Sequence, residues 1–126
     1  MKHAFFEGVL FILFISTTAF LPSPRSPIEG TWMGEFKNGA TILTIQVHFW
    51  TEDGETKGTI DIPQESVVRV PLEWIIVDST SVHFELVRDN GTRVFEGELK
   101  NGRIVGDYLT SGNRGSFYLI SATAAI

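Results

Sequence analysis

The sequence contains no cysteine among its 126 residues, which excludes disulfides, zinc–thiolate sites and thiol nucleophiles. Basic residues are also few. Because 10 Lys and Arg stand against 15 Asp and Glu, the formal net charge is −5. This acidic balance argues against nucleic acid, and against an anionic membrane surface, as a partner. No segment repeats its apolar residues with a helical period, which argues against a helical domain.

The long apolar sequence is confined to the N-terminus. Residues 1–21 hold five of the ten Phe, with an apolar run at 9–15 and small residues at 16–19. A positive start, a short apolar run and a small-residue region are typical of a secretory signal peptide. The apolar run is shorter than the about 20 residues that span a bilayer. We expect residues 1–21 to be a signal peptide, with cleavage after Ala19, and the protein to be exported to the periplasm or the extracellular space. The alternative is an uncleaved leader, which would be the only attachment to a membrane.

Three prolines stand in residues 22–27, directly after the leader. Proline fits neither a helix interior nor a central strand, so we interpret this segment as an extended tether. The domain then covers residues 28–121, and residues 122–126 form a tail or the start of a linker. Without disulfides, this domain must bury enough apolar surface by itself or bind a partner, and a domain of about 100 residues does so only marginally.

Apolar and polar residues alternate strictly along Leu43–Phe49 and along Val82–Leu86. Period-two alternation is typical of a strand with one buried face. Asn-Gly pairs at 38–39, 90–91 and 101–102 stand between such segments, and this pair favours a type I′ hairpin turn. We expect strands at 28–37, 41–51, 56–62, 67–70 (a strand or a loop), 73–78, 81–88, 92–99, 103–110 and 116–121.

Successive hairpins without long crossovers predict an all-β domain, an antiparallel up-and-down meander that closes into a barrel of roughly eight strands. A closed barrel is favoured over a sandwich because closure removes exposed strand edges. In the strand at 103–110, Ile104 and Tyr108 share one face while Val105 and Leu109 share the other. The alternation therefore does not tell which face of this strand points inward. Elsewhere we expect an inward face of large side chains and a filled core: Trp32, Phe36, Leu43, Ile45, Val47, Phe49, Ile60, Ile62, Ile75, Val77, Val82, Phe84, Leu86, Phe95, Leu99, Phe117 and Leu119.

Gly30-Thr31-Trp32 opens the first expected strand, and a Gly-x-Trp at this position resembles the start of lipocalin-like barrels. In that family the Trp plugs the closed end of the barrel, and the Gly lets the chain approach closely. The resemblance implies a lipocalin-like (calycin-type) barrel. It also implies one candidate function, the binding of a small apolar ligand.

A longer pattern extends over residues 28–121. It includes Gly30-x-Trp32-x-Gly34, the segment Gly58–Gln64, Phe95-Glu96-Gly97-Glu98-Leu99 and Ile104-Val105-Gly106-Asp107-Tyr108. This pattern resembles the small β-barrel domain that precedes the catalytic domain in many secreted bacterial α/β-hydrolases. The family's catalytic Ser, Asp and His lie in the following domain, so no catalytic residue carries over to this chain. The resemblance implies structural roles for Gly30, Trp32, Gly34, Asp61, Pro63, Gly97 and Gly106.

Residues that carry chemistry are sparse. The nucleophile elbow Gly-x-Ser-x-Gly is absent, and His48 and His83 are the only histidines after the leader. A catalytic or metal pair would require neighbouring strands that face one cavity, and zinc would need a third ligand. We therefore interpret both histidines as solvent-facing and expect no metal, cofactor or catalytic residue. Glu96 and Glu98 share one face, and the acidic hairpin at 52–55 lacks the spacing of a calcium loop, so we expect both groups to be solvated.

Trp50 and Trp74 lie on nominally outer phases, where an exposed indole is unfavourable unless something covers it. Two interpretations stay open. Either a partner or neighbouring domain covers these side chains, or they pack in the core and the phase is shifted. Our candidate surface for a ligand or partner consists of Trp50, Trp74, His48 and Tyr108. His48 lies beside Trp50, and Tyr108 lies on the strand with two apolar faces.

We therefore expect an exported, non-catalytic β-barrel module that serves as an accessory or interaction domain of a secreted α/β-hydrolase. The hydrolase domain would follow in cis, so that the sequence is a piece of a longer enzyme, or act as a separate protein partner. The alternative is a lipocalin-like binder of a small apolar ligand. Large inward side chains argue against the central cavity that this alternative requires.

Overall fold

The computed structural model describes residues 26–122. The segment expected to be a signal peptide with its cleavage site, residues 22–25 of the expected tether and residues 123–126 lie outside the described residues. A 3-10 helix, η1 (Pro63–Glu65), joins β3 to β4, and within residues 26–122 no helix is long and apolar enough to cross a membrane. The strands are β1 (Gly30–Asn38), β2 (Thr41–Glu52), β3 (Glu55–Ile62), β4 (Val67–Pro71), β5 (Glu73–Asp78), β6 (Ser81–Arg88), β7 (Gly91–Lys100), β8 (Arg103–Thr110) and β9 (Asn113–Ser121).

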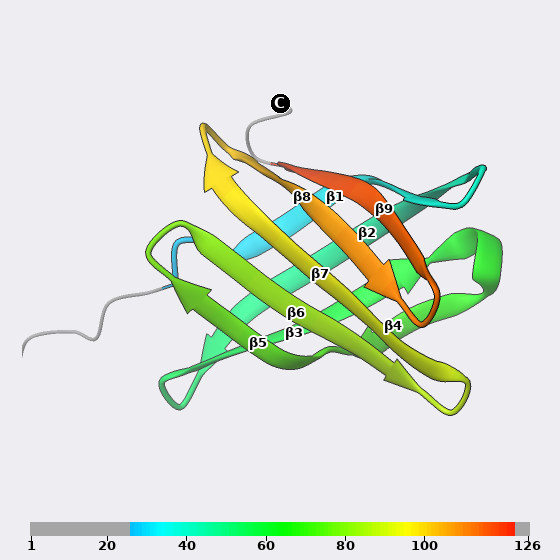
Figure 1. Ribbon diagram of the computed structural model, residues 1–126. Coiled ribbons are helices and arrows are strands. Elements are labelled where there is room, and N and C mark those ends of the chain that lie inside the picture. Colours follow the sequence, from blue (N-terminus) through cyan, green and yellow to red (C-terminus); the bar gives the residue numbers. More distant parts are fainter. Residues whose placement is uncertain (1–25, 123–126) are drawn as a thin grey trace, which may run out of the picture.

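The strands form one antiparallel sheet in the order β4-β3-β2-β1-β9-β8-β7-β6-β5. Pairing of β1 with β9 brings the two ends of the domain together, and the remaining seam lies between β3–β4 and β5. At this seam the backbone N–H of Leu72 donates to the carbonyl of Gly58 at 2.8 Å. Figure 1 shows β6, β7 and β8 crossing in front of β1, β2 and β3, as the sheet curls around its core. The predicted antiparallel barrel is confirmed, nearly closed and with nine strands instead of about eight.

The predicted core is confirmed in nearly all its members. Fourteen of the expected inward residues are buried, while Ile75, Val77 and Leu99 are partly buried and pack against them. Phe95 lies at the centre of the aromatic packing, with ring centroids 4.9 Å from Phe84, 5.2 Å from Tyr108 and 5.3 Å from Phe117. The core also contains residues that the alternation alone does not identify: Ile28, Val67, Leu72, Ile104 and Tyr108.

The register of β8 settles which of its faces is inward. Tyr108 lies opposite Phe95, and Gly106 lies opposite Gly97, so Tyr108 and Ile104 point into the core. Val105 points outward and is 49% exposed. The two strands approach so closely that a Cβ on Gly106 would overlap the carbonyl of Glu96. Only glycine, which has no Cβ, therefore fits at this position.

Turn geometry corrects one prediction. Both residues of the Asn-Gly pair at 101–102 have positive φ, as a type I′ turn requires, and so do Asp53 and Gly54. The prediction is wrong at 38–39 and 90–91. There only the glycine has positive φ, and one member of each pair belongs to a strand. The strand register therefore places these two turns one residue away from the Asn-Gly pair.

Two motif residues make specific hydrogen bonds, and a third begins the short helix. The indole N–H of Trp32 donates to the carbonyl of Ile28 at 2.8 Å, which ties the segment before β1 to the core. The Asp61 carboxylate accepts a hydrogen bond from the backbone N–H of Arg69 across the irregular β3–β4 pairing. Pro63 begins η1, where its fixed φ suits the first helical position.

Candidate functional site

The outer surface of β5–β8 presents aligned rows of side chains. Alternate residues of each strand point outward, and the antiparallel register places them opposite one another. One row contains Ile76, His83, Glu96 and Asp107, and the next contains Asp78, Ser81, Glu98 and Val105. We call this surface the acidic face, after its carboxylates Asp78, Glu85, Glu96, Glu98 and Asp107.

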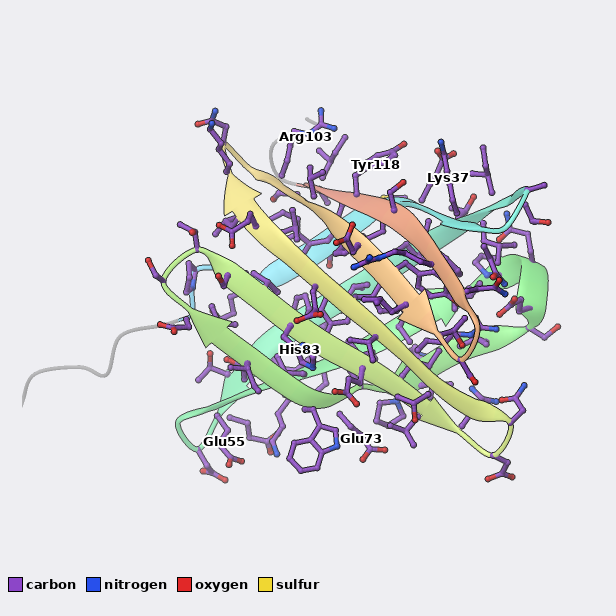
Figure 2. The ribbon with its side chains drawn as sticks, viewed as in Figure 1. Lys37, Glu55, Glu73, His83, Arg103 and Tyr118 are labelled. Atoms are coloured by element: carbon purple, nitrogen blue, oxygen red, sulfur yellow. The ribbon has the colours of Figure 1, made fainter. Side chains whose placement is uncertain are left out.

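His83 lies in the middle of the acidic face, on β6 (Figure 2). Its Nε2 lies 2.7 Å from Glu85 Oε2, and its Nδ1 lies 3.5 Å from Glu96 Oε2. Both ring nitrogens therefore face carboxylates, and the side chain is 26% exposed. An open groove of about 380 Å³ runs beside it, with Ile76 and Val105 among its lining residues. This arrangement favours a polar, negatively charged contact surface with apolar side chains inside it.

The charged surface continues across β8 and β9. Val105 lies opposite Tyr118, whose hydroxyl donates to a carboxylate oxygen of Glu35 at 3.2 Å. This hydrogen bond is the main reason why the pKa of Tyr118 is raised. The guanidinium of Arg103 lies 5.7 Å from the centre of the Tyr118 ring, and Figure 2 shows both side chains on the outside of the barrel.

Trp74 is the most exposed large apolar side chain of the domain, at 67%. Glu73 pairs with Glu85 and Ile76 pairs with His83, so Trp74 and Ile75 together face the single residue Phe84. This β-bulge leaves Trp74 with a φ of 53°, in the left-handed region. A residue with a Cβ pays about 1–2 kcal/mol for that conformation. The bulge therefore presents an indole to solvent on a strained backbone.

Trp50 and His48 lie elsewhere, on the outer face of β2. The two rings stack with centroids 5.6 Å apart, and Thr31 Oγ1 lies 3.0 Å from His48 Nδ1. Lys57 connects this pair to Trp74, because it lies opposite Trp50 in the register and lines a hollow of about 440 Å³ with Trp74. Trp50 thus lies on the outer phase, half-buried, as its position in the alternation predicts.

Of the predicted surface residues, His48, Trp50 and Trp74 lie on the outside and are linked through Lys57, whereas Tyr108 is buried. The two histidines do not form a pair. His48 is on β2 and His83 is on β6, and these strands are not neighbours in the sheet. Tyr108 is 0% exposed, so it does not lie on the outer surface predicted for it; its ring packs against Phe36 and Phe95. The reason is the register of β8, which the ambiguous alternation left open.

A second polar group lies at the end of the barrel near η1, and we call it the barrel-end cluster: Glu65, Arg93 and Tyr108. Arg93 Nη1 lies 2.6 Å from Glu65 Oε1, and Nη2 lies 3.3 Å from Oε2, which is a two-pronged ion pair. The two side chains are only 21% and 29% exposed. An open hollow of about 660 Å³ adjoins them. The sequence signal for this cluster is Arg93 itself, a charge on the inward phase two residues before Phe95.

Burial and the neighbouring charges together shift two pKa values in the barrel-end cluster. Burial raises the pKa of the Tyr108 hydroxyl; the nearby charge of Arg93 opposes the shift, and that of Glu65 adds to it. Burial works against the charge on Arg93, but the hydrogen bond to Glu65 and the attraction to the anionic forms of Tyr108 and Glu65 outweigh it, so the pKa of Arg93 is raised. Arg93 therefore stays charged and Tyr108 stays protonated near neutral pH.

Between residues 26 and 122, no group of three or more His, Asp or Glu is arranged to hold a metal ion. Comparisons with protein-family models, with curated proteins and with solved structures find no match to this chain.

Proposed function

We propose that this chain is a non-catalytic β-barrel module that docks onto a protein partner through the acidic face and the adjoining Trp74. The observation that carries the proposal is Trp74, whose indole is 67% exposed on a backbone held at a φ of 53°. Strained backbone and exposed large apolar side chains both concentrate at functional surfaces. Tryptophan is also among the residues that supply most of the energy of protein interfaces.

The charges of the acidic face define the chemistry of the partner. Glu96 and Glu98, on β7, lie between the exposed Ile76 on β5 and the exposed Val105 on β8, so a complementary surface carries Lys or Arg between apolar contacts. The net charge of −5 adds a long-range attraction to the same kind of surface. Because the sequence motifs resemble the domain that precedes secreted α/β-hydrolases, the partner in this proposal is such a catalytic domain, in cis or as a separate chain. The same resemblance and the leader support export.

A carrier of small apolar ligands is the second candidate function. Such a carrier needs open space at the centre of the barrel. Here the centre is occupied by stacked and edge-on rings: Phe84 and Phe95 lie 4.9 Å apart, and Phe36 lies 5.7 Å from Phe95. This packing supports a docking module over a carrier with a central cavity.

The reading frame beyond the codon for Ile126 tests the identity of the partner. The proposal expects it to encode an α/β-hydrolase domain with a Gly-x-Ser-x-Gly motif. That domain would be produced separately and titrated calorimetrically with the full chain. We expect Trp74→Ala to weaken binding by about 30-fold, which is the loss of a typical interface hot spot of about 2 kcal/mol. Affinity is also expected to fall as salt rises, because the charged groups become screened.

Ile42→Ala is the matched control for the titration. Ile42 is likewise an exposed apolar residue, at 54%, but it lies on β2, away from the acidic face. We expect this variant to bind like the parent. Equal losses at Trp74 and Ile42, or an affinity that does not change with salt, contradict docking through the acidic face. A reading frame without a hydrolase domain overturns a partner in cis; no binding of a separately produced hydrolase domain then overturns the assignment of the partner.

A further inference from the structure

The seam of the barrel leaves two strand edges without a neighbour. The sheet ends at β4 on one side and at β5 on the other (Figure 1), and the chain crosses the seam at Leu72. Beyond this crossing, Glu55–Lys57 of β3 pair with β2 and no longer with β4. On the other side of the seam, Ile75–Asp78 pair with β6 alone. The backbone groups on the outer edge of β5 are therefore open to a further strand.

Two open hollows follow this part of the seam. The first has a volume of about 440 Å³, and its lining residues include Thr56 of β3 together with Trp74 and Ile75 of β5. The second has a volume of about 410 Å³, shares Thr56 with the first, and reaches Val77 and Ser79. The open space thus runs along the free edge of β5, where an added strand would lie.

Of the two terminal strands, only β5 has a regular free edge. In β4, Pro71 has no N–H to donate, Arg69 has a φ of 47°, and the Arg69 N–H already donates to Asp61. Beyond the bulge at Trp74, the run Ile75–Asp78 contains no proline and no positive φ. Proteins usually protect an edge strand with charges, proline or bulges, because an open edge pairs readily with another chain. This run is apolar up to its last residue, so it lacks that protection.

The charges at the two ends of β5 exclude a second copy of this chain as the added strand. Antiparallel pairing of all six residues of β5 with the same strand of another copy would place Glu73 opposite Asp78. Like charges directly opposite each other destabilise a strand pair. Self-pairing at this edge is therefore disfavoured.

The same charges favour a strand that carries basic residues. In the part of the chain that the structure describes, neither Glu73 nor Asp78 takes part in an ion pair. Lys57, which lines the first hollow, is already paired with Glu55 at 3.1 Å. Figure 2 shows Glu55 and Glu73 pointing outward at the same edge of the barrel. A strand with Lys or Arg at each end complements this edge.

We propose that β5 takes up an extended segment of the partner protein as an additional strand, with Lys or Arg at each end of the segment and apolar residues between them. The backbone of the segment pairs with Ile75–Asp78, and its basic ends meet Glu73 and Asp78. In such strand addition, main-chain hydrogen bonds supply the affinity and alternate side chains supply the specificity. The inference rests on the proposed docking through Trp74, since it names the part of the partner that binds beside that residue.

A six-residue peptide that matches the length and the charges of β5 is the probe. Acetyl-Lys-Val-Thr-Val-Thr-Lys-amide would be titrated into the full chain, with amide hydrogen exchange followed by NMR to locate it. We expect slower exchange at those amides of Ile75–Asp78 that β6 leaves unpaired, and unchanged exchange in β1, which is paired on both sides. No slowing in β5, or equal slowing in β1, overturns the proposal.

Methylated peptides separate backbone pairing from attraction between charges. One version carries methyl groups on the first, third and fifth amides and the other on the second, fourth and sixth, so each version has one blocked edge. We expect the version whose blocked edge faces β5 to bind at least about tenfold more weakly than the unmodified peptide, because it loses the ladder of hydrogen bonds. Equal binding of both methylated versions and the unmodified peptide rules out strand addition.

The role of charge is tested on the protein and on the peptide. Asp78→Asn is expected to weaken binding of the basic peptide about two- to fivefold, the usual effect of an exposed ion pair. A peptide with Glu in place of both Lys is expected to bind at least about tenfold more weakly than the basic one, because Glu73 and Asp78 repel it. Asp89→Asn is the matched control: it removes the same charge from an exposed position in the turn after β6, whereas Asp78 adjoins the start of β6. Equal losses in Asp78→Asn and Asp89→Asn would show a nonspecific effect of net charge and would overturn the site.

Failure of this inference and failure of the proposed docking give different results. Binding of the hydrolase domain to the full chain without slower exchange in β5 refutes strand addition and leaves docking through Trp74 in place. Slower exchange in β5 with the peptide, together with no binding of the hydrolase domain, supports strand addition and refutes the assigned partner.

Discussion

Replacement of Trp74 by glycine and by alanine is expected to reverse the usual order of stability of these two residues. Trp74 has a φ of 53° at the β5 bulge, where any residue with a Cβ is strained. Alanine keeps that strain of about 1–2 kcal/mol, and glycine removes it. Glycine in turn costs about 0.5–1 kcal/mol through the greater freedom of its unfolded chain. The difference leaves Trp74→Gly more stable than Trp74→Ala by about 0.5–1 kcal/mol.

Ile76 supplies the internal control for this pair of variants. It lies two residues further along β5, its side chain is 55% exposed, and its backbone is outside the left-handed region. At Ile76 the ordinary order is expected, with alanine more stable than glycine by about 0.5–1 kcal/mol. Because both side chains are largely in solvent, neither truncation creates a large cavity in the core.

Urea unfolding of the four variants, followed by circular dichroism, measures both differences. The free energies of unfolding are compared between variants whose unfolding free energy depends on urea concentration with the same slope. An equal slope shows that the variants expose the same amount of surface when they unfold. If alanine is more stable than glycine at both positions, the bulge at Trp74 carries no strain. The reasoning that Trp74 is held in an unfavourable conformation for a partner is then refuted.

Two further predictions concern the core and its only tyrosine. Phe95→Ala is expected to lower the free energy of unfolding, measured in urea, by about 3–5 kcal/mol. Val68→Ala, at a 65% exposed position on β4, is expected to change it by less than about 0.5 kcal/mol. Similar losses in the two variants would refute the central place of Phe95 in the core. Burial raises the pKa of Tyr108 in the folded protein above its value of about 10 in the unfolded chain. The stability that the protonated hydroxyl contributes is therefore fully present below about pH 10, and it is lost as the pH rises through the folded pKa. Stability should therefore fall in alkaline solution less steeply in Tyr108→Phe than in the parent, and parallel curves would contradict the shift.

The strand pattern was largely readable from the sequence because each strand buries one face. Leu43–Phe49 alternates strictly, and the structure buries every second residue there. In β8, apolar residues occupy both phases, and alternation could not tell Tyr108 from Leu109. The tertiary pairing with β7 decided the phase, because Gly97 and Gly106 meet where the strands come closest.

The candidate site was only partly predictable. The outward phases of Trp50 and Trp74 follow from period-two alternation, but the strained backbone of Trp74 comes from a bulge, which arises only when β5 pairs with β6. The ion pair between Glu65 and Arg93 joins residues 28 positions apart. Neither residue carries a local signal that names its partner, since the pairing exists only after β3–β4 and β6–β7 have folded around one core.

The sequence by itself determined the class of fold, the position of most strands and nearly the whole core, because burial of one strand face imposes a period that local residues record. The tertiary structure decided the turn positions, which face of β8 points inward, the seam at Leu72, the acidic face and the barrel-end cluster. These features depend on strand register and on contacts between distant segments, where a shift of one residue reverses which side chains point inward. The proposed docking surface lies at such a place, the bulge beside the acidic face.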